Sequence, residues 1–505
     1  MKTKYFLLCV MGLIFLNISC KKFLDQKPRS EATDQTTWKS DGDANASVAA
    51  CYSLIRSAFN ASITYYAYGD LIADEFSDVV GGDPAYRDIM QMNWGVNIAF
   101  TNTYDPRIKQ RVYTNFYTAI SQSNRCLHFI QDMPASAFDG SSPEEQQARK
   151  NHYLGEAYFT RAFNYFYIAR VWGDVPLVTV YSADAANEKQ LPRTPQKEVL
   201  TQVVSDLKMA RQYLDWKDDG SVEKVVRADK GSVFALMAHV YAWKGEYDSC
   251  NAVSDSVINS GSYSLVDGNE YMNIYKGQSS EGIFEIAQSS ASESMNARDV
   301  GTITGVTLTA PYLSGGPTIP AWQINTNLTN YLYSDTNDLR FKKAFVVLSN
   351  GSNNPVECIK YSNIQPVNNN PAYLIASNNI IVFRLAGIML LKAEALAAKP
   401  APDDAGALLL VNAVRYRAGI SQPLTGLTGN DLLYAIADER GRELFLEGHR
   451  FFDLIRLEKL TGEQQVPNMT HGEFTAGKYF WPVDPTLFIT NSNLTQTPFW
   501  ASRMR

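Results

Sequence analysis

The stretch LGEAYFTRAFNYFYIARVWGDVPLV, residues 154–178, decides most of what the sequence predicts about the fold. Its aromatic and aliphatic side chains recur at helical spacing, so we expect a helix over 144–172 with most of these rings in a core. Gly173 is placed to cap that helix, and Pro176 prevents its continuation. The stretch therefore predicts a long, largely buried helix with a sharp end.

A tetratricopeptide-like signature lies at the start of the same stretch. Leu154, Gly155 and Tyr158 match part of that repeat, in which glycine lets two helices approach closely. The segment MAHVYAWKGEYDSC, residues 237–250, has a similar order of helix, glycine turn and helix start. Further helices are predicted over 37–58, 107–133, 195–215, 228–243, 247–260, 382–398, 403–418 and 430–459.

Two long irregular stretches interrupt the helices. Residues 60–102 and 261–380 are rich in Gly, Asn, Asp, Ser and Thr, and only EGIFEIAQ (281–288) and VGTITGVTLT (300–309) give weak strand signals. We predict a mainly α fold of tetratricopeptide-like helix pairs, an α-α superhelix, with long irregular insertions carrying a few short strands. Loops on a rigid support are where recognition concentrates, so the insertions are the candidate ligand region.

The amino terminus has the layout of a secretory signal peptide. Lys2 and Lys4 precede a mostly apolar run over 5–18. That run is shorter than the roughly 20 residues that a membrane-spanning helix needs. We therefore predict a cleaved signal rather than a membrane span.

The end of this signal resembles the lipobox of bacterial lipoproteins. Ser19 precedes Cys20, although Asn17 stands where such boxes usually carry leucine. We predict a signal peptide over 1–19, lipidation of Cys20, and a lipidated tether over 20–35. The alternative is an ordinary signal peptide, or a cysteine that carries no lipid.

Composition excludes several partners. The formal net charge is −6 and no basic run occurs, which argues against nucleic acid. No later stretch approaches 18 consecutive apolar residues, so we expect membrane contact through the lipid anchor only.

Four further cysteines could pair or remain buried and free: Cys51, Cys126, Cys250 and Cys358.

No cofactor, metal or catalytic site is predicted. No two of the five histidines lie at metal-ligand spacing. The segment GEFTAGK, residues 472–478, has the skeleton of a phosphate-binding loop, but Tyr479 replaces the Ser or Thr that magnesium needs. We expect no enzyme, although a glycan hydrolase remains an alternative because its two carboxylates can be far apart in sequence.

Charged side chains repeat along the predicted helix over 430–459. Three carboxylates four residues apart have arginines near them: Glu439, Glu443 and Glu447, with Arg442 and Arg450. The arginines would hold the carboxylates ionised, which suits a salt-bridged helix packed on a neighbour better than acid–base catalysis. Asp453 and Arg456 receive the same interpretation.

Six motifs in order resemble the SusD/RagB family of outer-membrane nutrient-binding lipoproteins. The most specific is IADERGRELFLEGHRFFDLIRL, residues 436–457. The others are Cys20 followed by Phe23-Leu24-Asp25, the stretch 154–178, ADKGSVFALMAHVYAWKGEYD, the pair IVFRLAGIMLLKAEALA and VNAVRYRAGI, and WPVDPTLFITNSNLTQTP. The likeness extends over nearly the whole mature chain.

The resemblance implies a largely helical domain with four tetratricopeptide-like helix pairs and an irregular ligand face. It implies capture of an oligosaccharide, or of another nutrient such as a peptide, by a lipid-anchored protein on the outer membrane, facing the cell exterior. The partner would be a SusC-like TonB-dependent β-barrel transporter, and the protein would not be an enzyme. The resemblance also divides the chain into a SusD-like N-terminal region over 36–260 and a RagB/SusD C-terminal region over 261–505.

Two stretches of the insertions combine rings with polar side chains, as sugar sites do. The first supplies Tyr86, Arg87, Trp94, Asn97 and Asn102, and the second supplies Tyr312, Trp322, Gln323 and Asn325. We predict these as ligand-binding residues. The alternative is that the rings close the insertions onto the helical body. A third class of function, a helical-repeat adaptor lipoprotein without small-ligand binding, would need neither role.

Overall fold

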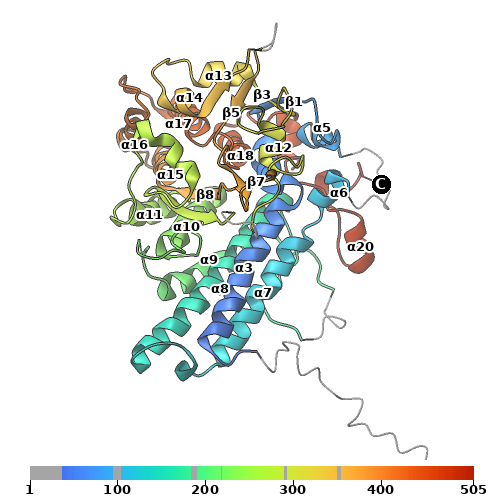
Figure 1. Cartoon of the computed structure of the whole chain (residues 1–505), viewed down its shortest axis with the longest axis vertical. Coiled ribbons are helices and arrows are strands. Elements are labelled where there is room, and N and C mark those ends of the chain that lie inside the picture. Colours follow the sequence, from blue (N-terminus) through green and yellow to red (C-terminus); the bar gives the residue numbers. More distant parts are fainter. Residues whose placement is uncertain are drawn as a thin grey trace, which may run out of the picture.

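The computed structural model describes residues 37–94, 104–183, 190–217, 219–288, 293–349 and 354–504, and it is mainly helical (Figure 1). The α-helices are α3 (Asp41–Asn60), α4 (Thr64–Tyr66), α5 (Ala85–Met90), α6 (Pro106–Arg111), α7 (Thr114–Asp132), α8 (Pro143–Trp172), α9 (Gln196–Tyr213), α10 (Lys230–Lys244), α11 (Tyr247–Ile258), α12 (Ile303–Thr307), α13 (Thr326–Leu332), α14 (Leu339–Ala344), α15 (Leu385–Ala398), α16 (Asp404–Arg417), α17 (Gly429–Glu443), α18 (Arg450–Thr461), α19 (His471–Thr475) and α20 (Thr486–Thr490). Tighter or wider turns form η1 (Ala61–Ile63), η2 (Ala67–Leu71), η3 (Ala135–Ala137), η5 (Gly268–Lys276) and η6 (Pro498–Trp500).

Strands are short and lie mostly in the insertions. They are β1 (Phe76–Val79), β2 (Gly282–Ile286), β3 (Trp322–Ile324), β4 (Phe345–Val347), β5 (Val356–Cys358), β6 (Ile364–Val367), β7 (Asn370–Ala376) and β8 (Ile380–Arg384). In the described residues they form four antiparallel two-stranded sheets: β1 with β3, β2 with β8, β4 with β5, and β6 with β7. The prediction of a mainly α fold with a few short strands is confirmed.

Successive helices pack as neighbours, as helical repeats require. α3 packs on α7, α8 packs on both α7 and α9, α10 packs on α11, and α15 lies against α11, α16 and α17. In Figure 1 the long helices α3, α7, α8 and α9 run side by side through the lower half, while the insertions and the later helices gather in the upper half. The helical pairs therefore form the support from which the insertions emerge.

The long helix α8 follows the sequence closely. It begins at Ser142, whose hydroxyl accepts the Glu145 amide at 3.3 Å, and it ends at Gly173, which has a φ of 73°. Its rings are buried or nearly so. A Cβ at Gly155 would lie 2.8 Å from the Leu214 side chain, so glycine permits the close approach of the segment that follows α9.

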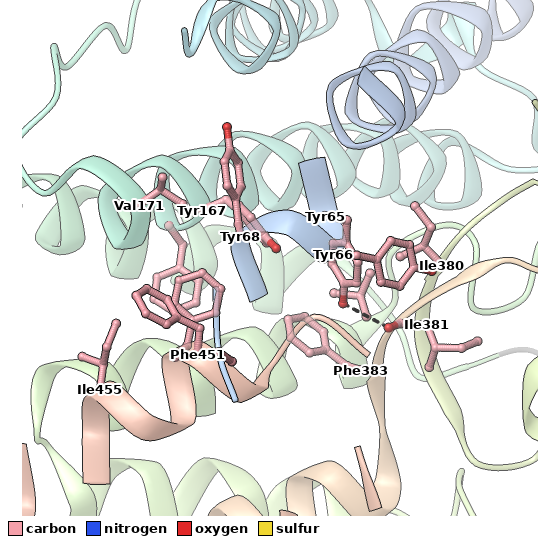
Figure 2. Packing of buried hydrophobic residues seen from close by; sticks show 14 of the residues in the cluster. Tyr65, Tyr66, Tyr68, Tyr167, Val171, Ile380, Ile381, Phe383, Phe451 and Ile455 are labelled. Carbon is pink, nitrogen blue, oxygen red and sulfur yellow. Dashed lines mark hydrogen bonds between the residues drawn. The ribbon is translucent and has the colours of Figure 1, made fainter. Parts of the chain in front are cut away.

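The main core joins α8 to the carboxy-terminal half (Figure 2). Side chains from α8, the segment 65–68, β8 and α18 converge there. The Tyr65 hydroxyl donates to the Ile381 carbonyl at 3.1 Å, and the ring of Tyr65 lies 6.2 Å from that of Tyr167. Aromatic rings that keep one polar contact thus connect segments far apart in sequence.

Two of the predicted segments differ from the structure, and one strand signal is confirmed. The helix predicted over 107–133 is interrupted after α6 at Val112, whose backbone is extended. The strand signal over 300–309 is wrong, because that segment contains α12, capped by Thr302 through the Gly305 amide at 3.1 Å. The signal over 281–288 is confirmed as β2.

The helix predicted over 430–459 is two helices, α17 and α18. We call the six residues between them, 444–449, the corner. Leu446 and Gly448 have φ values of 58° and 78°, in the left-handed region. A Cβ at Gly448 would lie 2.4 Å from the Tyr65 ring, so only glycine allows this approach. The corner turns the chain back into the core.

Candidate ligand-binding face

A strand pair joins the two insertions. β1 of the first insertion runs antiparallel to β3 of the second, with Phe76 opposite Ile324 and Val79 opposite Trp322. The Val80 amide extends the pairing with a 2.8 Å hydrogen bond to the Ala321 carbonyl. Two segments about 240 positions apart in sequence therefore form one surface beside α5 (Figure 1).

Trp322 lies at the centre of this junction and is fully buried. Its ring is 5.2 Å from that of Tyr86 and 5.4 Å from that of Phe76. Because Tyr86 is also buried, the contact between the two predicted stretches is an interior one. These buried rings pack the two insertions against each other.

Trp94 lies in a different contact. Its ring is 4.6 Å from Trp481, which is in turn 4.6 Å from Tyr68, and all three are buried. Trp94 and Trp322 contact different rings, and both are buried, so neither presents an open face to solvent. For these tryptophans and Tyr86 the structure favours the alternative in which the rings close the insertions onto the body. Direct ligand contact by them stays a prediction.

The polar candidates divide into one exposed residue and two that support the backbone. Arg87 is exposed, and its Nε donates to the Asp78 carboxylate at 2.9 Å. Gln323 donates to the Pro320 carbonyl. Asn325 caps α13 through the Leu328 amide at 3.3 Å and donates to the Asp74 carbonyl at 3.0 Å.

Tyr312 is half-buried. Three predicted residues, Cys20, Asn97 and Asn102, lie outside the described residues.

Sequence reasoning missed most of the exposed side chains above the strand pair. We call this surface the insertion face. Val80 and Arg87 come from the first insertion, and Val300, Ile319, Tyr373 and the half-buried Arg298 come from the second. The two sides touch, because a Cβ at Gly82 would meet the Val300 and Ala321 side chains at 3.8 and 3.9 Å.

Arg298 connects the insertion face to the β6–β7 hairpin. Its guanidinium donates to the Ala372 carbonyl at 3.2 Å and to the Ser314 carbonyl at 2.6 Å. Tyr373, next along β7, is 65% exposed and is the aromatic residue among the six that define the insertion face. The turn residues Asn368 and Asn369 have positive φ values, which asparagine tolerates in tight hairpins. The sequence NNN before PAY was the local signal for this hairpin.

The corner anchors the first insertion through buried carboxylates. The Gly448 amide donates to Asp70 at 2.8 Å, and the Leu446 amide donates to Glu75 at 3.1 Å. Burial raises the pKa of both carboxyls well above its ordinary value. Arg450 then binds Asp74 through two 2.8 Å hydrogen bonds. The first insertion is thus fixed just before β1.

Buried arginines anchor the second insertion to α17. Arg340 contacts Glu439 at 2.6 Å and Glu443 at 2.9 Å, and Arg384 contacts Glu443 at 2.6 Å and Glu447 at 2.8 Å. All of these side chains are 1% exposed or less. They bind segments on both sides of β4–β7 to one helix and its corner.

These contacts test the prediction of a salt-bridged cluster. Burial alone would raise the pKa of Glu447, but the charges of Arg384 and Lys360 outweigh it and lower that pKa to about 2. The pKa values of Glu439 and Glu443 are also lowered, since arginine charges outweigh their burial. The prediction of a salt-bridged cluster is confirmed by these contacts, but Glu447 lies in the corner rather than on the helix face. Of the two predicted arginines, Arg442 contacts Glu439, whereas Arg450 pairs with Asp74.

Asp453 and Arg456 form a related cluster on α18. Their side chains are 2.8 Å apart, and Asp453 also contacts Arg440 at 2.8 Å. Burial would raise the pKa of Asp453, but Arg440 and Arg456 lower it. The arrangement fits a structural role better than proton transfer.

A separate cavity of about 320 Å³ lies between α3, α8 and the α9–α10 connection. Trp216, His152 and Arg149 line it, and so does the buried pair of Arg227 and Glu156. That pair is joined at 2.7 Å. The cavity is built from helices, away from the strand pair that joins the insertions.

Neither a metal centre nor a membrane span is found in the described part of the chain. No group of three or more His, Cys, Asp or Glu there could hold a metal ion. No helix among those residues is both long and apolar enough to cross a bilayer.

Comparison with protein families gives two matches, one at each end of the chain. Residues 22–242 match a family described as "Starch-binding associating with outer membrane", and residues 321–500 match the SusD family, also called SusD/RagB. The two matched ranges contain both strands of the β1–β3 pair. SusD-like protein P38 of Formosa agariphila is 27% identical over 97% of each chain.

Solved structures have the same fold. A SusD homologue from Bacteroides thetaiotaomicron superposes with a TM-score of 0.75 at 29% identity, covering 91% of this chain and 98% of that one. A structure named as a laminarin-binding SusD-like protein has a TM-score of 0.69 at 22% identity, covering 91% and 99%. The tetratricopeptide-like helical fold is therefore shared with these structures.

Proposed function

Because the chain belongs to the SusD/RagB family, we propose that it is a nutrient-binding protein of the cell surface that captures an oligosaccharide on the insertion face. The observation that carries the proposal is the β1–β3 pair, which joins two aromatic-rich insertions into one exposed surface on a rigid helical support. Bound glycan is then delivered to a SusC-like TonB-dependent transporter in the outer membrane.

A glycan is the ligand class that the observations support best. A similar structure is named as laminarin-binding, and one matched family is described as starch-binding. The insertion face offers the exposed ring of Tyr373, exposed apolar side chains and the guanidinium of Arg87. Rings stack on the C–H faces of sugars, and charged or amide groups bind their hydroxyls. A peptide ligand is the competing class.

Among the predicted residues, Arg87 and Tyr312 are the ones we propose for direct contact, together with Tyr373. Asn97 and Asn102 remain candidates from the same first insertion. We propose that Trp94, Trp322, Tyr86, Gln323 and Asn325 act by fixing the shape of the face.

We propose that the protein is held to the membrane by lipid on Cys20, with no catalytic role. Two acyl chains give stable anchoring, whereas one gives marginal binding. The carboxylate cluster of α17 supports a non-catalytic function, because every one of Glu439, Glu443 and Glu447 contacts buried cations. A general acid would need a raised pKa and access to substrate.

The test is calorimetry on the protein from Lys21 onward, titrated with α-glucans, β-glucans, anionic glycans and peptides. Any ligand that binds is then titrated into Arg87→Ala, Tyr312→Ala and Tyr373→Ala. The matched control is Tyr416→Ala, an exposed tyrosine on α16 outside the insertion face. We expect a loss of about tenfold or more in affinity for at least one face variant and none for the control.

Two outcomes would overturn parts of the proposal. Binding that Arg87→Ala, Tyr373→Ala and the neighbouring-segment variant Tyr312→Ala all leave unchanged would remove the insertion face as the site, and Trp216→Ala would then test the helical cavity. Release of shortened glycan during the titration would establish a hydrolase. Co-purification of the lipidated protein with a β-barrel partner from outer membranes tests delivery separately.

A further inference from the structure

Two buried cysteines face each other between α3 and α7. The sulfurs of Cys51 and Cys126 are 3.9 Å apart, and both side chains are fully buried. They belong to a small core cluster with Val48 of α3, Ile130 of α7 and Tyr153 of α8. Figure 1 shows α3 and α7 side by side along most of their length.

The surroundings of the two sulfurs make the contact specific. The Ser123 hydroxyl donates to the Cys51 sulfur at 3.8 Å, and the Gln122 amide donates to the Cys126 sulfur at 3.6 Å. The hydrogen bond between the thiols lowers the pKa of Cys51 and raises that of Cys126. Side chains of α7 thus contact both sulfurs at the point where the two cysteines meet.

The two remaining described cysteines offer an internal comparison. Cys250 is buried between α11, α10 and α15, and Cys358 is buried on β5 in the main core. Burial raises the pKa of each to about 12. Neither makes a sulfur–sulfur contact like that between Cys51 and Cys126, so they act as reference thiols in the same chain.

We propose that Cys51 and Cys126 form a disulfide that links α3 to α7 in the exported protein. A disulfide bond is about 2.0 Å long, so the sulfurs must approach by about 2 Å, shared between rotations of two side chains and a small helix shift. The inference rests on the proposed export, because disulfides persist in oxidising compartments such as the periplasm and the cell surface.

The reaction is a thiol–disulfide exchange with an oxidised dithiol oxidase of the cell envelope. The thiolate of one cysteine attacks the oxidase disulfide, forms a mixed disulfide and releases one oxidase thiol. The second cysteine, as thiolate, attacks the mixed disulfide and releases the other oxidase thiol. The chain loses two electrons and two protons, and the oxidase gains them.

Burial sets the time at which this exchange can occur. Both sulfurs are inaccessible once α3 packs on α7, so the oxidase must act before these two helices have packed together. The bond would close the segment 52–125, which contains β1 and α5. It would thereby fix the two helices between which the first insertion leaves the scaffold and returns to it.

The first experiment counts thiols in protein from Lys21 onward, exported to the periplasm of a bacterial host. The protein is denatured in N-ethylmaleimide without reductant and analysed by peptide mass spectrometry. We expect a linked pair of peptides containing Cys51 and Cys126, with only Cys250 and Cys358 alkylated. Alkylation of all four cysteines, also after refolding in oxidised glutathione, would overturn the proposal.

The second experiment measures the consequence for stability. A disulfide across a loop of this length should raise Tm by about 5 °C over the reduced protein. Cys51→Ala/Cys126→Ala should lose this dependence on reductant, and Cys250→Ala should keep it. An equal response of both variants to reductant would contradict the assigned pair. Ligand titration of the oxidised protein reports on the proposed function independently, since a disulfide can form in a chain that binds no glycan.

Discussion

The helical layer and the insertion-bearing half of the molecule bury their interiors with different chemistry. In the layer, the ring of Phe59 in α3 meets those of Phe116 in α7 and Phe163 in α8 at 5.6 and 6.0 Å. A helix satisfies its own backbone amides, so its neighbours need supply only apolar surface. Irregular chain does not, and its buried amides must find other acceptors.

Buried carboxylates supply those acceptors throughout the insertion-bearing half. Each of six fully buried acids accepts a backbone amide from an irregular segment: Asp70 from Gly448, Glu75 from Leu446, Glu281 from Val266, Glu285 from Gln278, Glu357 from Thr309, and Glu458 from Gln465 and Val466. Other buried acids are paired with arginines: Glu439, Glu443, Glu447 and Asp453, and Glu281 makes both kinds of contact. The comparison teaches that the insertions, besides their ring contacts, need buried acids to bind their free amides, whereas α3, α7 and α8 need no such acceptors for their backbone.

The largest effect that this comparison predicts is loss of one arginine from the buried cluster. Arg384→Met leaves Glu281, Glu443 and Glu447 without a cation that contacts all three. We expect the free energy of unfolding to fall by about 3–5 kcal/mol, the usual cost of breaking a buried ion pair. Urea denaturation followed by circular dichroism measures it.

The matched control is a partly exposed pair. Lys244→Met removes the partner of Glu246, which lies 2.7 Å away, and should cost less than about 1 kcal/mol. Equal losses for Arg384→Met and Lys244→Met would mean that the buried cluster adds nothing to stability.

The next largest effect is a loss of stability at low pH that depends on Glu447. The pKa of Glu447 is lowered to about 2 in the fold, so its contribution is present above pH 4.5 and is lost as the pH falls toward 2. The stability gap between wild type and Glu447→Gln should therefore narrow by about 3 kcal/mol across that window. Urea midpoints at a series of pH values measure the gap, and a gap independent of pH would refute the ionised state.

A smaller effect is expected in the helical layer. Ile55→Val removes one methylene from a side chain of α3 that is 1% exposed. Such a change costs about 1 kcal/mol, because no polar group loses a partner. Thermal denaturation measures it. A loss of stability as large as that of Arg384→Met would contradict the claim that the two regions depend on different interactions.

The smallest net effect is expected for an acid whose partner is a backbone amide. Burial raises the pKa of Asp70, so its contribution is present below the ordinary carboxyl pKa and is lost as the pH rises. Asp70→Asn keeps an acceptor for the Gly448 amide and should change stability by less than about 1 kcal/mol at pH 7. The free energy of unfolding of the variant, relative to that of wild type, should increase as the pH rises from 4 to 8. A gain in the opposite direction would show that Asp70 is held ionised.

The helical layer could be predicted from sequence because its signals are local. The spacing of rings along 154–172, the cap at Gly173 and the small residue Gly155 each act within a few turns of one helix. The corner could not be predicted in the same way. Glu439, Glu443 and Glu447 keep a helical spacing across a break that depends on the contact of Gly448 with Tyr65.

The arrangement of the insertion face could be predicted only in part from the sequence. Composition identified two stretches that the β1–β3 pair joins, yet it could not tell which rings would be exposed. Trp94 is covered by Trp481, nearly 400 positions later, and such contacts leave no trace in local patterns. The exposure of Tyr373 could not be predicted either, because it depends on whether other segments of the folded chain cover the β6–β7 hairpin.

The β1–β3 pair also has a consequence for the order of folding. Val79 and Trp322 cannot pair until the chain between them, about 240 residues, has brought its ends together. Contacts of such high sequence separation form late, because the entropy of closing the loop is lost before they gain anything. The proposed binding surface would then be assembled on a scaffold already in place. A nascent or damaged chain could hold its helices while still being unable to recognise its ligand.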